Sequence, residues 1–150
     1  MNLKLQESRQ NGLPRLLLLA RRGFLARVKL DLQENAGYPF NAYTGFALPF
    51  IDLNGTSLTE LSKKMGVSKQ AVSKTVRELE AAGLIKQIID QNDQRKRVVT
   101  FTDQGIDYMK KLHKSIKKAE LELSNHLGAD EFQRLKMTLK KSLNFYAQIR

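Results

Sequence analysis

The sequence predicts a mainly α-helical fold with one small β-hairpin. Three observations support this prediction: two short helices joined by a glycine turn within residues 58–82, two β-branched runs around a basic loop within residues 85–101, and amphipathic patterns at both ends of the chain. We therefore predict a winged helix-turn-helix over residues 38–102, flanked by N- and C-terminal dimerisation helices at residues 13–37 and 103–150. The 150 residues are expected to form a single unit.

A short helix is predicted to begin at Leu58. Ser57 and Glu60 have the S-x-x-E spacing of a capping box, in which the serine hydroxyl accepts a hydrogen bond from the first turn and the glutamate reaches back. Gly66 is expected to end this helix, because glycine adopts the left-handed conformation that many helix C-termini need. Ser68 is then a suitable N-cap for a second helix.

The second helix, from about Lys69 to Ala82, has two chemically different faces. At 100° per residue, the apolar arc consists of Val72, Thr75, Val76 and Leu79. The opposite arc consists of Lys69, Gln70, Ser73, Lys74 and Arg77. The first face should pack on the domain. The second carries the hydroxyl, amide, ammonium and guanidinium groups that hydrogen-bond base edges and phosphates in a DNA major groove. Gly83 is expected to stop the helix, with Leu84 making the hydrophobic contact of the cap.

Two short strands with a basic loop follow the second helix. The runs Ile85–Ile89 and Val98–Phe101 are rich in β-branched residues, and the polar segment Asp90–Arg97 separates them. The cations of this segment are Arg95, Lys96 and Arg97. A flexible cationic loop beside such a helix could follow the phosphate backbone into the neighbouring minor groove, where the potential is most negative.

The hairpin also carries the residues of a known motif. Asp93 and Arg95 form a D-x-R pair, and Phe101, Thr102 and Gly105 follow as a hydrophobic-Thr pair and a glycine. This pattern resembles the winged helix-turn-helix of the MarR (multiple-antibiotic-resistance regulator) family. The resemblance implies a homodimeric repressor whose terminal helices interlock and whose matching arginine, Arg95, enters the minor groove. It also implies relief of repression by a small phenolic or lipophilic ligand.

We therefore predict a transcriptional regulator that binds double-stranded DNA sequence-specifically at an inverted repeat. The predicted DNA-contacting residues are Ser68, Lys69, Gln70, Ser73, Lys74, Arg77, Asp93, Arg95, Lys96 and Arg97. The alternative is an architectural or protein-interaction winged helix that coats DNA without sequence preference, or that docks on a partner through a lysine stripe. This stripe consists of Lys110, Lys111, Lys114, Lys117 and Lys118, and such stripes are usually solvated. Gln70 and Ser73 favour base contacts over charge neutralisation alone.

Helices from both ends of the chain carry a surplus of apolar surface. The first is predicted from Leu13 to about Asn35, and its segment Leu16–Ala20 is apolar on every side. A long helix from Asp103 has a heptad-like stripe, and an amphipathic helix follows Gly128. The surplus predicts a homodimer formed through Leu16, Leu17, Met109, Leu112, Ile116, Leu139 and Leu143. The alternative for Leu16–Leu19 is burial under the C-terminal helices of the same chain.

An aromatic cluster lies between the first helix and the helix-turn-helix. Five of the eleven aromatic residues fall between Tyr38 and Phe50. They could be plain core, or they could line a ligand pocket formed by Tyr38, Phe40, Tyr43 and Phe46. Gly45 and Pro49 predict that a helix here is short or kinked.

Composition narrows the remaining functions. The net charge of +11 is spread along the chain and favours a polyanionic partner. Because there are no cysteines, disulfides and thiolate metal sites are excluded, and His113 and His126 lack a second ligand at metal-binding spacing. No motif of an enzyme active site occurs, so we expect neither an enzyme nor a cofactor. The polar segment Met1–Gly12 and the short run Leu16–Ala20 predict a cytoplasmic protein without a membrane span.

Overall fold

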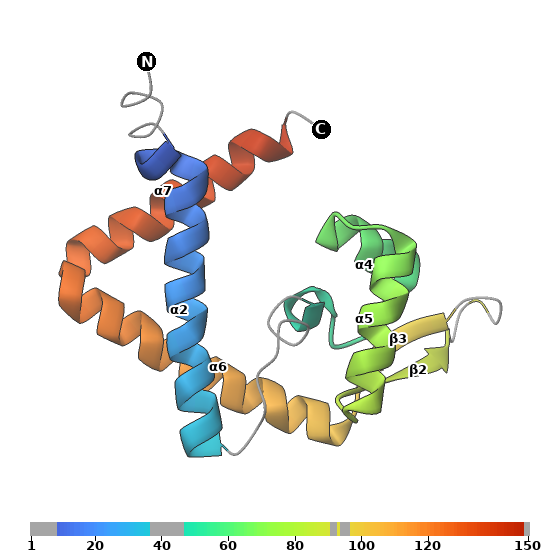
Figure 1. Ribbon diagram of the computed structural model, residues 1–150. Helices are drawn as coiled ribbons and strands as arrows, with labels where there is room; N and C mark the ends of the chain where they lie inside the picture. Colours follow the sequence, from blue (N-terminus) through green and yellow to red (C-terminus); the bar gives the residue numbers. More distant parts are fainter. Residues whose placement is uncertain (1–8, 37–46, 91–92, 94–96, 149–150) are drawn as a thin grey trace.

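The computed structural model describes residues 9–36, 47–90, 93 and 97–148 of the chain, and it is mainly helical (Figure 1). The α-helices are α2 (Leu13–Ala36), α4 (Leu58–Met65), α5 (Lys69–Ala81), α6 (Asp103–Leu127) and α7 (Ala129–Ala147), with the 3-10 helix η1 (Leu48–Phe50). The strands are β1 (Thr56–Ser57), β2 (Ile85–Ile89) and β3 (Arg97–Phe101). The predicted fold class, a winged helix-turn-helix flanked by terminal helices, is confirmed.

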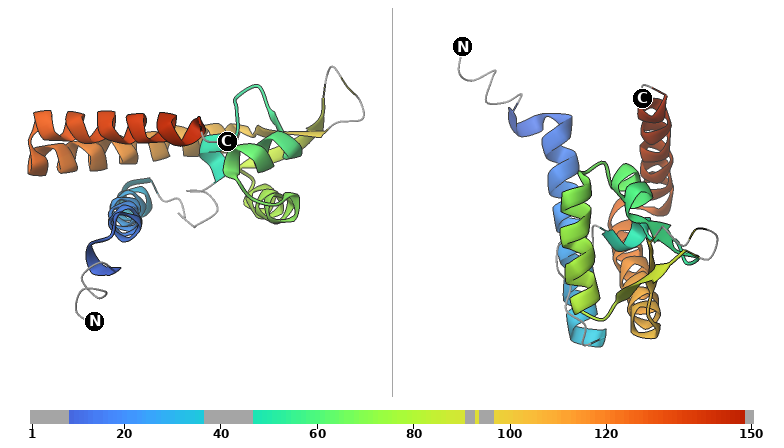
Figure 2. Two further views of the ribbon diagram at one scale, coloured as in Figure 1. Left: turned by 90° about the horizontal axis from the view of Figure 1, so that it is seen from above. Right: turned by 90° about the vertical axis from the view of Figure 1, so that its right-hand side faces the viewer.

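Helix α6 connects the two parts of the molecule (Figures 1 and 2). The winged helix-turn-helix, with α4, α5 and the sheet, lies near the N-terminal end of α6. Helix α2 packs across α6, and α7 turns back after Gly128, whose φ is 89°. The β2–β3 hairpin extends away from the helices in each view. Helix α5, the predicted recognition helix, and the wing therefore lie toward one end of α6.

Local sequence signals explain the helix-turn-helix. The Ser57 Oγ accepts a hydrogen bond from the Glu60 N–H at 3.2 Å, and the Ser68 Oγ accepts one from the Ala71 N–H at 3.2 Å. Gly66 has a φ of 68°, in the left-handed region that ends a helix most easily when no Cβ is present. Both predicted N-caps and the predicted turn are confirmed.

The sheet has one strand more than the sequence predicts. The strand order is β1-β3-β2 with antiparallel neighbours, and Ile85 pairs with Phe101 while Ile89 pairs with Arg97. The prediction missed β1, because two residues are too few for an alternating pattern. It also placed Arg97 in the loop, whereas Arg97 is the first residue of β3. The core beneath the sheet includes Leu61, Val72, Val76, Leu79, Ile85, Val99 and Phe101.

The buried stripe of α6 packs within the chain, against the winged region at its N-terminal end and against α2 farther along. It consists of Gly105, Tyr108, Leu112, Ser115 and Ala119. On α2, Val28 and Leu32 are fully buried. Leu112 is only 3% exposed, so its assignment to an interface between two copies is wrong. Met109 and Ile116, assigned to the same interface, are partly buried and pack against this intramolecular core. The prediction chose Met109 and Ile116 instead of their buried neighbours Tyr108 and Ser115. The reason is that Ser115 is polar and is not counted in an apolar pattern.

Helix α2 has almost the predicted bounds, and its leucine-rich start is uncovered. Leu16, Leu17, Leu18 and Leu19 are 45% to 62% exposed. Their burial under the C-terminal helices of the same chain, the alternative prediction, is therefore wrong. Although α7 crosses α2 in Figure 1, the two helices lie apart when viewed from above (Figure 2). Within the described residues, none of the helices combines the length and apolar character that spanning a membrane requires.

The segment before β1 is described only from Ala47. Pro49 lies in η1, near its N-terminus, where the missing N–H of proline breaks no helical hydrogen bond. Ala47, Leu48 and Ile51 are buried in the core. The predicted pocket residues Tyr38, Phe40, Tyr43 and Phe46, together with Gly45, lie outside the described residues.

Candidate nucleic-acid interface

Helix α5 presents one polar face to solvent. Its opposite face is buried through Val72, Thr75, Val76 and Leu79. On the solvent side, Lys69, Gln70, Lys74 and Arg77 are exposed, and Ser73 is half-buried. The two faces divide as the helical periodicity predicts. A convex row of amide, ammonium and guanidinium groups on an exposed helix has the chemistry needed to contact both base edges and phosphates.

The cations of this face are not neutralised by neighbouring carboxylates. Lys69, Lys74 and Arg77 form no ion pair with any residue in the part of the chain that the structure describes. Lys64 on the preceding helix differs, because its Nζ lies 3.1 Å from a Glu60 carboxylate oxygen and also pairs with Asp52. The charges of α5 thus remain available to an anionic partner.

The C-terminal end of α5 is capped, and a side-chain contact links it to β2. Gly83, with a φ of 72°, donates its N–H to the Glu80 carbonyl at 2.9 Å, and the Leu84 N–H donates to the Leu79 carbonyl at 3.0 Å. This is a Schellman cap, and Leu84, predicted to make its hydrophobic contact, is buried. The Glu80 carboxylate also accepts hydrogen bonds from the Gln87 N–H at 3.3 Å and Nε2 at 3.1 Å. The Glu80–Gln87 contact was not predicted, because nothing in a periodic pattern identifies it.

The wing is described in part. The Asp93 N–H donates to an Asp90 carboxylate oxygen at 3.1 Å, which forms a turn where β2 ends. Arg97 is exposed at the start of β3, opposite Ile89. Arg95 and Lys96 lie outside the described residues. The structure therefore places Asp93 and Arg97 at the loop end of the hairpin.

Comparison with known proteins agrees with this geometry. Residues 47–96, which contain the helix-turn-helix and much of the wing, match the family model for MarR. The HTH-type transcriptional regulator TcaR of Staphylococcus aureus is 25% identical over 119 residues, covering 77% of this chain and 76% of TcaR. The predicted resemblance to the MarR family is confirmed over residues 47–96. The chain is similar to winged-helix transcriptional regulators of this type.

Solved structures share the fold over most of their length. A mutant of MarR from E. coli complexed with operator DNA has a TM-score of 0.73 and 22% identity, covering 91% of this chain and 96% of that one. The transcriptional repressor CouR bound to a 23-mer DNA duplex has a TM-score of 0.71 and 22% identity, covering 91% and 95%. CouR from Rhodococcus jostii RHA1 is also known bound to p-coumaroyl-CoA, with a TM-score of 0.65 and 19% identity, covering 87% and 91%.

One curated relative is an enzyme. The riboflavin kinase of Pyrococcus furiosus is 37% identical over 65 residues, which covers 43% of this chain but only 29% of the kinase. A match to so small a share of an enzyme does not transfer its activity. Among the described residues, no group of histidine, aspartate or glutamate residues could hold a metal ion.

The lysine stripe on α6 is partly neutralised. Lys111 lies 3.0 Å from Asp107, and Lys117 lies 3.4 Å from Glu120. Lys118 pairs with Asp31 on α2, whose side chain is only 11% exposed. Three of the five lysines thus have a carboxylate partner within the chain. This supports a structural role for much of the stripe.

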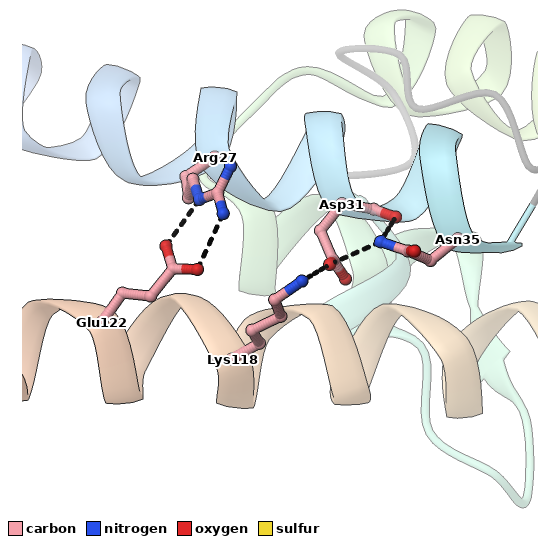
Figure 3. A network of polar contacts seen from close by, with 5 residues as sticks. All are labelled: Arg27, Asp31, Asn35, Lys118 and Glu122. Carbon is pink, nitrogen blue, oxygen red and sulfur yellow. Dashed lines mark hydrogen bonds and ion pairs between the residues drawn. The ribbon is translucent and has the colours of Figure 1, made fainter.

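Figure 3 shows how these charges link α2 to α6. The Arg27 guanidinium donates two hydrogen bonds to the Glu122 carboxylate, one of them at 2.7 Å. Asp31 accepts hydrogen bonds from Lys118 and, at 2.8 Å, from Asn35. Hydrogen bonds from Lys118 and Ser115 hold the pKa of Asp31 below its usual value, and the bond from Arg27 lowers the pKa of Glu122. The network holds the two helices in one relative position.

A groove of about 630 Å³ lies between the loop that precedes β1 and the N-terminal half of α6. It is lined by Leu53, Ile106, Asp107, Met109, Lys110, Lys111, His113 and Lys114. Leu53, Ile106 and Met109 give it apolar lining, and most of its charged groups are cationic. An amphipathic anion is the ligand class that such a groove could hold.

Proposed function

We propose that this regulator binds double-stranded DNA sequence-specifically as a homodimer that represses transcription. Two copies of α5 would occupy successive major grooves of an inverted repeat, because a two-fold protein matches two-fold DNA. The observation that supports this most directly is the exposed face of α5, on which the amide of Gln70 stands among cations that form no ion pair in the described structure. The DNA-contacting residues that we propose for the regulator are those predicted from the sequence.

Uncovered apolar surface supports the homodimer. The exposed leucines Leu16 and Leu17 lie near the start of α2, and Leu139 and Leu143 are exposed on α7. Phe145 and Tyr146 add aromatic surface to the same helix. Large apolar side chains concentrated on two helices are unusual on a monomer, and a second copy would remove them from water.

The wing and the related structures support the DNA-binding mode. The hairpin extends beyond the helices, and its loop carries Arg95 and Lys96. We infer that Arg95 enters the flanking minor groove, where narrow A·T-rich DNA attracts arginine. CouR is a repressor solved on a DNA duplex, and MarR is solved on operator DNA. A role on DNA would place the protein in the cytoplasm.

We further propose that a small lipophilic or phenolic anion relieves repression. CouR binds p-coumaroyl-CoA, an aromatic anion. In this protein, the groove rimmed by Lys110 and Lys114 has complementary charge. The aromatic pocket of Tyr38, Phe40, Tyr43 and Phe46 stays a second prediction for the ligand site.

The experiment that tests the main proposal begins with selection of a binding site from random duplexes. The selected duplex and a scrambled duplex of equal composition are then titrated at one fixed salt concentration. We expect at least a thousandfold preference for the selected site, as is typical of specific regulators. Equal affinity for both duplexes would instead establish the architectural alternative.

A further inference from the structure

Thr102 lies where β3 ends and α6 begins, and its side chain contacts two other elements. The Oγ accepts a hydrogen bond from the Gly105 N–H at 2.9 Å, which caps the N-terminus of α6. The same hydroxyl donates to the Gly83 carbonyl at 2.6 Å, directly after α5. The Thr102 N–H also donates to the Leu84 carbonyl at 3.1 Å. One residue therefore joins the end of the recognition helix, the sheet and α6.

The backbones at this junction are in close contact. A Cβ added to Gly105 would lie 1.8 Å from the Leu84 carbonyl oxygen and 3.2 Å from Phe101 Cδ1. Only a glycine permits α6 to approach the turn after α5 so closely. The hydroxyl of Thr102 thus bridges two backbone segments that already touch, and its two hydrogen bonds fix their relative rotation.

The junction lies at the N-terminal end of a long helix, so a small change of angle there moves distant parts of the molecule. Helix α6 runs from Asp103 to Leu127, a length of about 38 Å at 1.5 Å per residue. The recognition helix ends at the junction, and the terminal helices contact α6 farther along (Figure 1). A small rotation at Thr102 would displace the exposed face of α5 relative to α2 and α7.

We propose that Thr102 is a positioning residue that fixes the angle between α5 and α6 and thereby sets the half-site spacing that the dimer accepts. The angle is a property of one chain. The spacing rests on the proposed function, because it requires a dimer on an inverted repeat. Thr102 touches no DNA in this proposal and acts through the orientation of α5.

Three substitutions separate the contributions of the hydroxyl. Thr102→Val keeps the shape and loses both side-chain hydrogen bonds. Thr102→Asp keeps an acceptor for the α6 cap, but its ionised carboxylate cannot donate to the Gly83 carbonyl. Thr102→Ser keeps both functions and is the matched control. Because Thr102→Asp retains the cap, it remains informative if Thr102→Val fails to fold.

The angle is measured without DNA. The chain has no cysteines, so spin labels can be placed at Ala71→Cys on α5 and Lys114→Cys on α6. Labelled chains are diluted with unlabelled chains so that distances within one copy dominate. We expect a broader distance distribution for Thr102→Val and Thr102→Asp, and an unchanged distribution for Thr102→Ser. An unchanged distribution in folded Thr102→Asp would overturn the proposal.

The spacing is measured on unlabelled protein, with the selected site and with duplexes whose half-sites are moved by one or two base pairs. We expect wild type and Thr102→Ser to prefer the selected spacing. In Thr102→Asp, the ratio of affinities for the selected and the shifted spacings should fall about tenfold. The affinity of Thr102→Asp for scrambled DNA should change less than about twofold. Retained spacing preference would overturn the second half of the proposal. If wild type itself has no preferred spacing, the proposed inverted repeat fails, and the distance distribution still decides the role of Thr102.

Discussion

The protein presents two cationic helix faces, and they differ in what surrounds their charges. On α5, Lys69, Lys74 and Arg77 form no ion pair within the described structure, and the amide of Gln70 lies among them. On α6, three of the five stripe lysines pair with carboxylates, and one of these pairs fastens α6 to α2. A count of lysines therefore does not identify a binding surface. The cations that no carboxylate satisfies are the better guide.

The largest expected effect tests this difference directly. Combined Lys69→Ala, Lys74→Ala and Arg77→Ala substitutions should abolish measurable specific binding and flatten the slope of log K against log salt by up to about five units per dimer, because each lost phosphate contact removes roughly 0.9. The matched control is Lys111→Ala, Lys117→Ala and Lys118→Ala, which removes the same charge from the three lysines of α6 that pair with carboxylates. If both variants lose affinity equally, net charge alone governs binding.

The second prediction concerns the homodimer that the proposed DNA-binding mode requires. Leu17→Lys should convert a dimer to a monomer, because it places a charge within the uncovered leucines of α2. The measurement is sedimentation at micromolar concentration. Leu121→Lys is the control, since Leu121 is 61% exposed on α6 and lies outside the predicted interface. A wild-type monomer under these conditions would remove the dimer model.

The third prediction separates base contacts from phosphate contacts within α5. Gln70→Ala should cost about 1 to 3 kcal/mol on the selected site and little on scrambled DNA, if the amide makes a paired contact with a base. Lys74→Ala should weaken both duplexes by a similar factor. Equal losses on both duplexes for Gln70→Ala would show that the amide does not contact a base edge.

The fourth prediction extends the comparison to the wing. Arg95→Ala should flatten the salt slope by up to about two units per dimer and reduce any preference for A·T pairs beside the half-sites. Arg97→Ala is the comparison within the wing, because Arg97 begins β3 rather than standing in the loop; a smaller change than for Arg95→Ala would assign most of the effect to the loop arginine. An unchanged affinity and slope, in an Arg95→Ala variant that folds and dimerises, would assign binding to α5 alone.

The winged region was predicted more accurately than the terminal helices, for a physical reason. Its boundaries depend on contacts between near neighbours in sequence. Ser57 and Ser68 each accept a hydrogen bond from the N–H three residues later, and Gly66 ends a helix through its own backbone conformation. Such signals can be recognised from residue types at fixed spacing. The terminal helices were found by the same means, but their partners were not.

Partner choice depends on contacts that span the chain. Arg27 meets Glu122 across 95 residues, and Thr102 meets Gly83 across 19. No periodic pattern encodes these pairs. The buried face of α6 was also displaced in the prediction, because Ser115 is buried beside the carboxylate of Asp31 and an apolar count ignores it. The exposed polar face of α5 could be predicted without knowing such long-range contacts, because it lies on a single helix.

The smallest expected effect concerns the Lys118–Asp31 ion pair, which joins α6 to α2. Lys118→Met should leave DNA affinity unchanged and lower stability at pH 7 by up to about 1 kcal/mol, because the lysine is half exposed. The pKa of Asp31 is lowered in the folded protein, so its contribution is complete above the ordinary aspartate value of 3.8 and is lost as pH falls through the lower folded value. Urea unfolding between pH 7 and pH 3 should therefore show a smaller acid-induced loss for Asp31→Asn than for wild type. A parallel loss in both proteins would mean that Asp31 contributes nothing to the acid sensitivity. A fall in the DNA affinity of Lys118→Met would mean that the stripe on α6 takes part in binding after all.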